Sequence, residues 1–375
     1  MRIFANAFLV AFAIDALLAI ASFGLGAGIA GLASARALCT GFVTLASLPV
    51  FVLMGAHPGL RWRIFLPPCL FLSWTAMGAM PLPICLSASD AGLVVGVLGA
   101  AFAAVAFVLC RQSNGWKGWL LGEEALQGLT FSGRTALGFT ALNLFAILPA
   151  SLAYLAFSAA AGVGHLTQGF VDIRRDGIHL SHREYIREGQ TIHLVAMMHI
   201  GDPAFYDELA LSLPEQGAIT LVEGVTDEAE LLSESLSYGN VAASLGLVEQ
   251  PELGGGDREL RSADVDVSEF SPDTMEFLAS LGTILSSETF VDGLIAYAEL
   301  TNMSSETAVK MLAALKHDLL ELRNDHLFEE MEMALRDYDQ IIVPWGALHL
   351  PGIQDRLREL GFVQEVETYR RVVGW

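Results

Sequence analysis

The sequence predicts two unlike parts: an all-α transmembrane bundle of about five helices over residues 1–165, and a soluble α/β domain over residues 166–375. Three observations predict this division. The chain is 53% hydrophobic with a positive mean hydropathy, and its apolar runs of membrane-spanning length fall in the first half. The second half alternates short apolar runs with helical periodicity, which is typical of a central, largely parallel sheet.

Five apolar runs in the first half are each long enough to cross a bilayer, which takes about 20 residues. They cover 4–24, 37–56, 64–86, 91–110 and 136–161. The first run is too long, and too closely followed by the next, for a cleaved signal peptide. We therefore expect a multi-pass membrane protein with the lipid bilayer as a partner.

Basic residues beside the predicted helices indicate the orientation of the chain. One side of the membrane carries Arg2, Arg61, Arg63, Arg111, Lys117 and Arg134, and the other carries Arg36, Arg174 and Arg175. The side richer in Lys and Arg faces the cytoplasm. The N-terminus is therefore predicted to be cytoplasmic and the soluble domain extracytoplasmic.

The segment 115–134, between the fourth and fifth predicted helices, places Trp116, Trp119 and several leucines among polar residues. Such a segment is either a helix lying in the membrane interface or a plain loop.

The net charge of −21 belongs to the second half, because the only acidic residues before residue 165 are Asp15, Asp90, Glu123 and Glu124. An acidic domain repels phosphate backbones, so nucleic acid is excluded as an expected partner. All four cysteines lie in the first half, which leaves the soluble domain without disulfides or thiolate ligands.

The soluble domain is predicted to open with a hairpin and then to alternate strands with helices. The strands are expected at Phe170–Ile173, Ile178–Leu180, Thr191–Met198, Ala218–Val222 and Gln340–Val343. Helices are expected from Asp202-Pro203, from Asp227 to about Leu247, from Ser271-Pro272, over Ala308–Arg336 with one break, and from Pro351.

Ligand-type residues follow the three strongest strand predictions: His199, Glu223 and His349. The carboxyl ends of parallel strands line the crevice where α/β proteins bind ligands. Both histidines also precede a predicted helix N-terminus, whose positive potential favours neutral imidazole. Two imidazoles and a carboxylate match a divalent first-row metal site with open positions for water.

The motifs Ala196-Met-Met-His199 and Gly346-Ala-Leu-His349 resemble the paired GxxH motifs of the TraB/TIKI family, with Ala196 where that family usually has glycine. Glu223 resembles the glutamate after that family's next strand, and Arg323-Asn324 resembles its Arg-Asn element on the helix before the second motif. The resemblance covers about residues 190–362.

The resemblance implies an EreA/ChaN-like fold, shared with erythromycin esterase and the haem-binding ChaN proteins. TIKI members are membrane-tethered proteases that depend on a divalent metal, and other TraB members are peptide-pheromone shutdown proteins. Function therefore varies across this one fold.

The leading hypothesis is a membrane-anchored hydrolase that cleaves a peptide or ester bond. His199, Glu223 and His349 would hold a divalent cation (Mn, Co or Zn) that activates water. By resemblance, Arg323 would stabilise the oxyanion and Asn324 would orient a histidine. Alternatively, Glu223 acts as a general base without a metal, and the histidines handle proton transfer.

Two other classes of function stay open. A non-catalytic, membrane-bound protein would sequester a peptide or cofactor in the same crevice. A transporter would need paired charges inside the membrane, and the predicted spans show only Asp15, without a basic partner.

Further candidate ligands are weaker. Asp264 and Asp266 could join a metal shell, although acidic residues in loops are usually exposed to solvent. His179, His182 and His193 lie near the opening strands and could mimic a cluster. His179 and His193 are interpreted as strand side chains, and none of the three is assigned a role.

Overall fold

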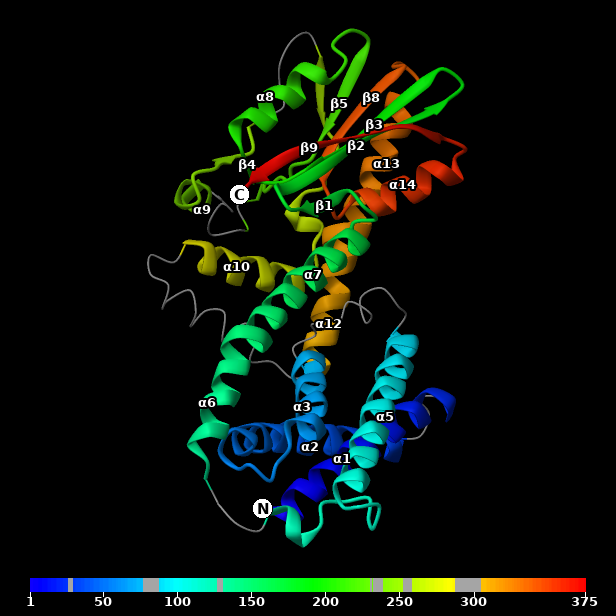
Figure 1. Cartoon of the computed structure of the whole chain (residues 1–375). Helices are drawn as coiled ribbons and strands as arrows, with labels where there is room; N and C mark the ends of the chain where they lie inside the picture. Colours follow the sequence, from blue (N-terminus) through cyan, green and yellow to red (C-terminus); the bar gives the residue numbers. More distant parts are fainter. Residues whose placement is uncertain are drawn as a thin grey trace. The chain divides into compact units, whose positions relative to one another are not determined.

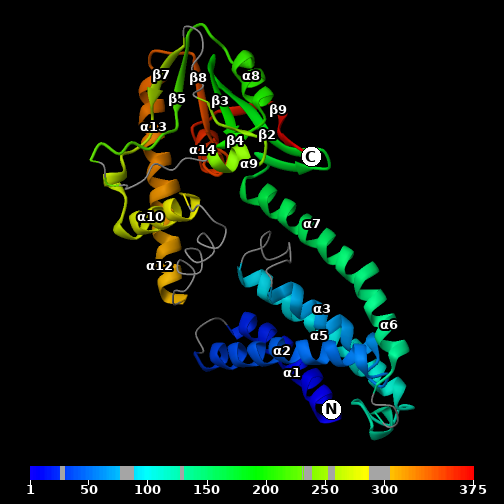
Figure 2. The ribbon, with the colours of Figure 1, turned by 90° about the vertical axis from the view of Figure 1, so that its left-hand side faces the viewer.

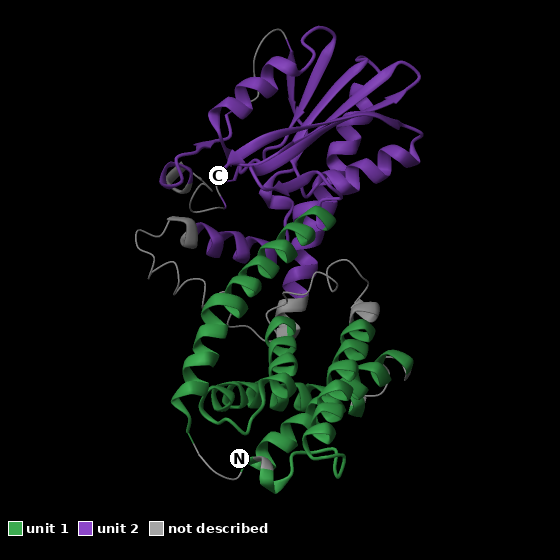
Figure 3. Cartoon of the chain, in the orientation of Figure 1, with its two compact units in different colours: residues 1–165 green, residues 166–375 purple. Residues whose placement is uncertain are grey.

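The computed structural model describes residues 1–25, 30–76, 88–126, 131–229, 231, 239–251, 258–286 and 305–375. The chain divides into two compact units, Met1–His165 and Leu166–Trp375 (Figure 3). Each unit is described by itself.

Unit 1 is helical in the part that the structure describes (Figure 1). Its α-helices are α1 (Arg2–Leu25), α2 (Ala30–Ala56), α3 (Trp62–Ala76), α5 (Ala88–Ser113), α6 (Gly133–Leu142) and α7 (Leu148–Leu166). A π-helical segment, Asn143–Ile147, joins α6 to α7, and a short 3-10 helix spans Glu123–Leu126. The described residues between α5 and that 3-10 helix form turns and loop. Of the two structures predicted for this segment, they form the loop and not the interfacial helix.

Helices α1 and α5 pack closely because small residues lie between them. A Cβ atom at Gly96 would come within 2.9 Å of the Ile20 side chain and 3.0 Å of the Ala19 Cβ. The space is therefore too small for any side chain, which is how small residues allow membrane helices to approach. Rings of Phe8, Phe12 and other buried apolar residues fill the rest of this interior.

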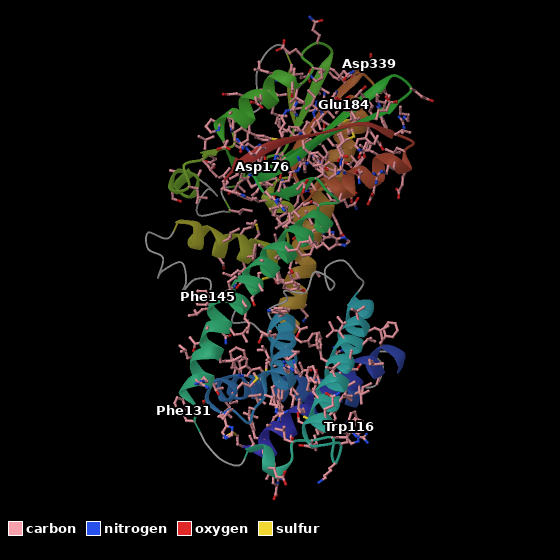
Figure 4. All side chains as sticks on the ribbon, in the orientation of Figure 1. Trp116, Phe131, Phe145, Asp176, Glu184 and Asp339 are labelled. Atoms are coloured by element: carbon pink, nitrogen blue, oxygen red, sulfur yellow. The ribbon has the colours of Figure 1, made fainter. Side chains whose placement is uncertain are left out.

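Four helical stretches are long and apolar enough to cross a membrane: Arg2–Gly24, Ser34–Ala56, Gly92–Ser113 and Gly133–Leu166. Their outer surfaces are apolar as well. Phe145, in the last of these stretches, is 83% exposed, and Trp116 and Phe131, next to the ends of two stretches, are exposed as well. Figure 4 labels these three side chains. Exposed apolar side chains of this kind suit contact with lipid. The remaining predicted span, 64–86, coincides with α3 as far as Ala76, and residues 77–87 lie outside the described residues.

Unit 2 is built on a seven-stranded mixed sheet with a largely parallel centre. The strands are β1 (Val171–Arg174), β2 (Gly177–Arg187), β3 (Gln190–Met197), β5 (Ala218–Val222), β7 (Glu259–Ser262), β8 (Gln340–Gly346) and β9 (Val363–Gly374). Their order is β1-β2-β3-β8-β5-β7, with β9 paired to β2. The pairs β3–β8, β8–β5 and β5–β7 are parallel, whereas β2 runs antiparallel to β1, β3 and β9. A separate two-stranded sheet joins β4 (Ile200–Gly201) to β6 (Val248–Glu249).

Helices cover both faces of the large sheet, with α8 on one side and α13 on the other (Figure 2). The α-helices described in unit 2 are α8 (Pro203–Ser212), α9 (Gly239–Ser244), α10 (Pro272–Ser286), α12 (Ser305–Lys316), α13 (Arg323–Ala334) and α14 (Leu350–Glu359). The central strands are fully buried at Ile192, Leu194, Ile341 and Val343. Each such side chain contributes about 1.5–3 kcal/mol through burial, so the centre of the sheet is a rigid base for the residues that follow the strands.

The prediction of a helix starting at Asp227 is wrong. The chain forms a bridge at Thr226 and a turn at Glu228, and α9 starts only at Gly239, with residues 230 and 232–238 outside the described set. The Asp266 carboxylate accepts hydrogen bonds from the Thr226 hydroxyl (2.9 Å) and the Glu228 backbone N–H (3.0 Å). These contacts hold the segment in a non-helical path.

The predicted break in the long helix before β8 is a π-helical segment, His317–Leu322, between α12 and α13. Asp318 in this segment accepts hydrogen bonds from the backbone N–H (2.8 Å) and the hydroxyl (2.6 Å) of Ser271, at the start of α10. Leu319 and Leu322 pack against a small core of Val265, Val267, Phe270 and Leu278. The segment therefore fixes the rotation of α13 just before Arg323.

Candidate active site

Three of the parallel strands end next to one buried cluster of polar side chains. Glu223 directly follows β5, Asp264 lies two residues beyond β7, and His349 lies three residues beyond β8. Arg323 reaches the same place from the first position of α13. The cluster lies at the carboxyl edge of the sheet, where α/β proteins bind ligands.

The guanidinium of Arg323 contacts all the other members of this cluster. Its Nε and Nη2 donate to Asp264 Oδ1 (2.9 Å) and Oδ2 (2.6 Å), a bidentate pair. Nη2 also donates to Glu223 Oε1 at 2.8 Å, and Nη1 donates to His349 Nε2 at 3.1 Å. Burial lowers the pKa of Arg323, but the hydrogen bonds and charges of Asp264 and Glu223 outweigh it and raise that pKa overall. The group is a permanent buried cation.

Asp264 anchors Arg323 through a carboxylate whose oxygens also accept backbone hydrogen bonds. Gly224 N–H donates to Oδ2 and Val265 N–H donates to Oδ1, both at 2.9 Å. Asp264 is buried, so these charge-assisted bonds offset the cost of removing the carboxylate from water. The side chain positions Arg323 and is shielded from solvent.

Glu223 is held from two sides and stays partly open. Its Oε2 accepts a hydrogen bond from the Gly346 backbone N–H, and its Oε1 accepts from Arg323. The Oε1 atom lies 3.7 Å from His349 Nε2, and the Glu223 side chain is 14% exposed. A carboxylate and an imidazole nitrogen therefore lie near each other at the edge of the cluster.

His349 is buried and neutral. Its Nδ1 lies 2.8 Å from Asn324 Oδ1, and Asn324 Nδ2 donates to the His349 carbonyl at 3.3 Å. Because Arg323 donates to Nε2, the proton of the neutral ring lies on Nδ1 and points at Asn324. Burial, helped by the charge of Arg323, lowers the pKa of His349 to about 4 against the opposing effect of Glu223. The edge of the ring packs on Trp345, with ring centroids 5.1 Å apart.

His199 lies in an exposed bend between β3 and β4, and its carbonyl accepts a hydrogen bond from Gln250 N–H at 2.8 Å. Its charge acts on the pKa of His349. Even so, among the described residues, the side-chain ligand atoms of His199, Glu223 and His349 do not all lie within 4.8 Å of one another. Of the residues singled out from the sequence, the structure brings together Glu223, Arg323, Asn324 and His349.

Asp264 is a member of this cluster that the sequence reasoning left as an exposed loop residue. No strand was predicted before Asp264, because the four residues of β7, Glu-Leu-Arg-Ser, contain only one apolar side chain. Asp266, in contrast, caps the short 3-10 helix Val267–Glu269 by accepting from Ser268 N–H at 3.0 Å. Hydrogen bonds from Ser268 and the Glu228 backbone hold its pKa well below the usual range.

A second cluster, also unassigned from the sequence, consists of His182, Glu184 and His193. Each offers one ligand atom, and these atoms all lie within 4.8 Å of one another, close enough to hold a metal ion. The sequence-based interpretation of His179 and His193 as strand side chains is right, because they lie on β2 and β3. What the sequence did not show is that the strands bring the rings of His182 and His193 together.

Asp15 has polar neighbours that the sequence reasoning missed. The hydroxyl of Thr40 donates to its carboxylate, and Arg36 lines the same cavity of about 310 Å³ inside unit 1. Arg36 lies one residue before the predicted span 37–56, so the expectation that the other predicted spans hold no basic partner for Asp15 stays a prediction.

Comparisons of the chain with protein-family models, curated proteins and solved structures gave no match. The resemblance to TraB/TIKI proteins therefore rests on the short motifs alone.

Proposed function

We propose that this chain is a membrane-anchored hydrolase that cleaves a peptide or ester bond at Glu223, Arg323 and His349. The observation that carries the proposal is the pair formed by Glu223 Oε1 and His349 Nε2, 3.7 Å apart beside the guanidinium of Arg323. A carboxylate, a neutral imidazole and a fixed cation are the groups that general acid–base catalysis with oxyanion stabilisation requires.

In the proposed reaction, Glu223 takes a proton from a water molecule that attacks the carbonyl carbon. The proton taken by Glu223 then moves to His349 Nε2, 3.7 Å from Glu223 Oε1, and from Nε2 to the leaving group as its bond to the carbonyl carbon breaks, while Asn324 keeps the other ring nitrogen protonated. The contacts with described residues use four of the five N–H donors of Arg323. The remaining donor, on Nη1, is available to the developing oxyanion.

A divalent metal (Mn, Co or Zn) shared by His199, Glu223 and His349 does not fit this arrangement. Arg323 already donates hydrogen bonds to the two atoms that would coordinate the ion, Glu223 Oε1 and His349 Nε2. Metal binding there would require the guanidinium to leave both. The proposal therefore uses the metal-free form of the hydrolase, with a peptide or small-molecule ester as substrate.

The test is hydrolysis of fluorogenic peptides and chromogenic esters by the purified full-length chain in detergent. We expect Glu223→Gln to lower kcat/KM by about 10²- to 10⁴-fold, the usual contribution of a general base. Glu332→Gln, the same substitution at an exposed position of α13, should leave activity unchanged. Equal activity of the wild type and Glu223→Gln would overturn the proposal.

The competing non-catalytic function makes a different prediction in the same assay. A protein that only sequesters a peptide or cofactor would show no turnover that depends on Glu223, and would retain ligand when His349 is replaced. Peptide binding measured in parallel with hydrolysis therefore separates the two functions.

We further propose that unit 2 lies on the extracytoplasmic side of a bilayer that unit 1 spans. The bias of basic residues in the sequence supports this side. All four cysteines precede residue 111, so one cysteine introduced at Glu332 reports on unit 2. A membrane-impermeant thiol reagent should label it in intact cells, and labelling only after lysis would reverse the orientation.

A further inference from the structure

His182, Glu184 and His193 share one face of the large sheet. Glu184 on β2 lies directly opposite His193 on β3, and His182 is two residues before Glu184. Successive side chains of a strand point to opposite faces. Arg183 and Tyr185 reach Gln354 of α14, so the three cluster residues lie on the face away from α14. Figure 4 labels Glu184 on the sheet of unit 2.

The potential ligand atoms are spaced as a metal site requires. His182 Nε2 lies 3.1 Å from His193 Nδ1, and that Nδ1 lies 3.7 Å from Glu184 Oε1. Zinc bonds of about 2.0–2.2 Å in a tetrahedral arrangement place neighbouring ligand atoms about 3.3–3.6 Å apart. Small side-chain movements therefore suffice to place one ion in contact with all three atoms.

Gln340 sets the tautomer of His193. Its Oε1 lies 2.8 Å from His193 Nε2, and a carbonyl oxygen can only accept, so Nε2 carries the proton. The lone pair of Nδ1 then faces His182 and Glu184. A hydrogen bond of this kind to the far nitrogen is the usual partner of a metal-binding histidine.

The site also has suitable charge and access. Both histidines are buried, whereas the Glu184 side chain is 28% exposed and connects the site to solvent. Burial lowers the pKa of His182 to about 4, with smaller effects in the same direction from His193 and Arg370. The ring is therefore neutral near pH 7, the form that binds metal.

We propose that His182, Glu184 and His193 bind one divalent first-row transition metal ion, with zinc as the best fit and the fourth coordination position open to solvent. Two imidazole nitrogens and one carboxylate oxygen are a donor set that zinc prefers. This site is separate from the proposed active site, shares no residue with it and does not depend on the hydrolase proposal.

The test is zinc and cobalt binding by the full-length chain in detergent after treatment with a chelator. We expect one equivalent of zinc in competition with a chromogenic chelator, and cobalt absorption bands of a four-coordinate site. His193→Ala and Glu184→Gln should abolish stoichiometric binding. Gln340→Ala should weaken it about 10- to 100-fold, as loss of a partner to a ligating histidine does.

Matched controls separate this site from the active-site residues. His199→Ala and His349→Ala should bind zinc as the wild type does, and circular dichroism should show that each variant is folded. Two results would overturn the proposal: a folded wild type that binds no equivalent of zinc or cobalt, or binding that survives His193→Ala and is lost in His349→Ala. If the folded wild type binds no metal, the three side chains form a hydrogen-bonded cluster and not a metal site.

Discussion

The two histidine clusters of unit 2 contain similar groups but differ in their central contact. At the sheet edge, the guanidinium of Arg323 donates to both Glu223 Oε1 and His349 Nε2. On the sheet face, His182 and His193 contact each other directly, and Glu184 lies beside them. A histidine and a glutamate are therefore not sufficient to indicate a metal site. In both proposals, the presence or absence of a neighbouring guanidinium separates donors that would serve acid–base chemistry from donors that would bind a metal.

The largest expected effect is on stability, from removing the central cation. Arg323→Ala leaves the carboxylates of Asp264 and Glu223 without their cation, and we expect a loss of about 3–5 kcal/mol, as for other broken buried pairs. The measurement is denaturant unfolding followed by tryptophan fluorescence. Arg358→Ala removes an exposed ion pair with Asp355 and should cost less than about 1 kcal/mol. Similar losses for the two variants would contradict a buried charge cluster.

The second prediction is a shared pH dependence of stability. His182 and His349 have folded-state pKa values lowered to about 4, below the ordinary 6.5. Below pH 6.5 the unfolded chain therefore binds protons that the folded chain does not. Stability is complete above pH 6.5 and falls as the pH drops towards 4, by about 3 kcal/mol per histidine.

Unfolding midpoints between pH 4 and 7 check this dependence. His349→Gln and His182→Gln should each flatten the pH profile by a similar amount in metal-free protein. Added zinc should steepen the profile of the wild type and of His349→Gln but not that of His182→Gln, because protons and zinc compete for the sheet-face site. Profiles that do not change in any variant would show that neither ring is buried and neutral.

The smallest expected effect concerns the orientation of His349. Asn324→Ala removes the acceptor for Nδ1 and should cost about 1 kcal/mol of stability, the net value of one hydrogen bond. Nitrogen chemical shifts should show the imidazole shifting from one tautomer to a mixture. Unchanged shifts would mean that Arg323 alone fixes the ring.

The central strands were predictable because their apolar runs are buried on both faces. The runs at β3, β5 and β8 lie where the sequence placed them, and so does the α8 start at Asp202-Pro203. Strands β7 and β9 were not predicted, because many of their residues are polar. Without a predicted strand at β7, the sequence did not indicate that Asp264 follows a strand of the sheet.

Contacts that depend on pairing between strands were not predictable. The sequence indicated a strand end at Leu180, whereas β2 continues to Arg187 and pairs with β3. Only this longer hairpin places His182 beside His193. Likewise, the position of Arg323 depends on the π-helical turn before it, because an ordinary helical turn there would rotate the guanidinium away from the cluster.

The most direct test of the whole account is hydrolysis by full-length protein stripped of metal, compared with the same protein reloaded with zinc, manganese or cobalt. The account predicts the same kcat/KM in each sample, and a large loss when Arg323 is replaced by lysine, which cannot form the bidentate contact with Asp264. Activity that disappears on stripping, returns with metal and survives Arg323→Lys would contradict it.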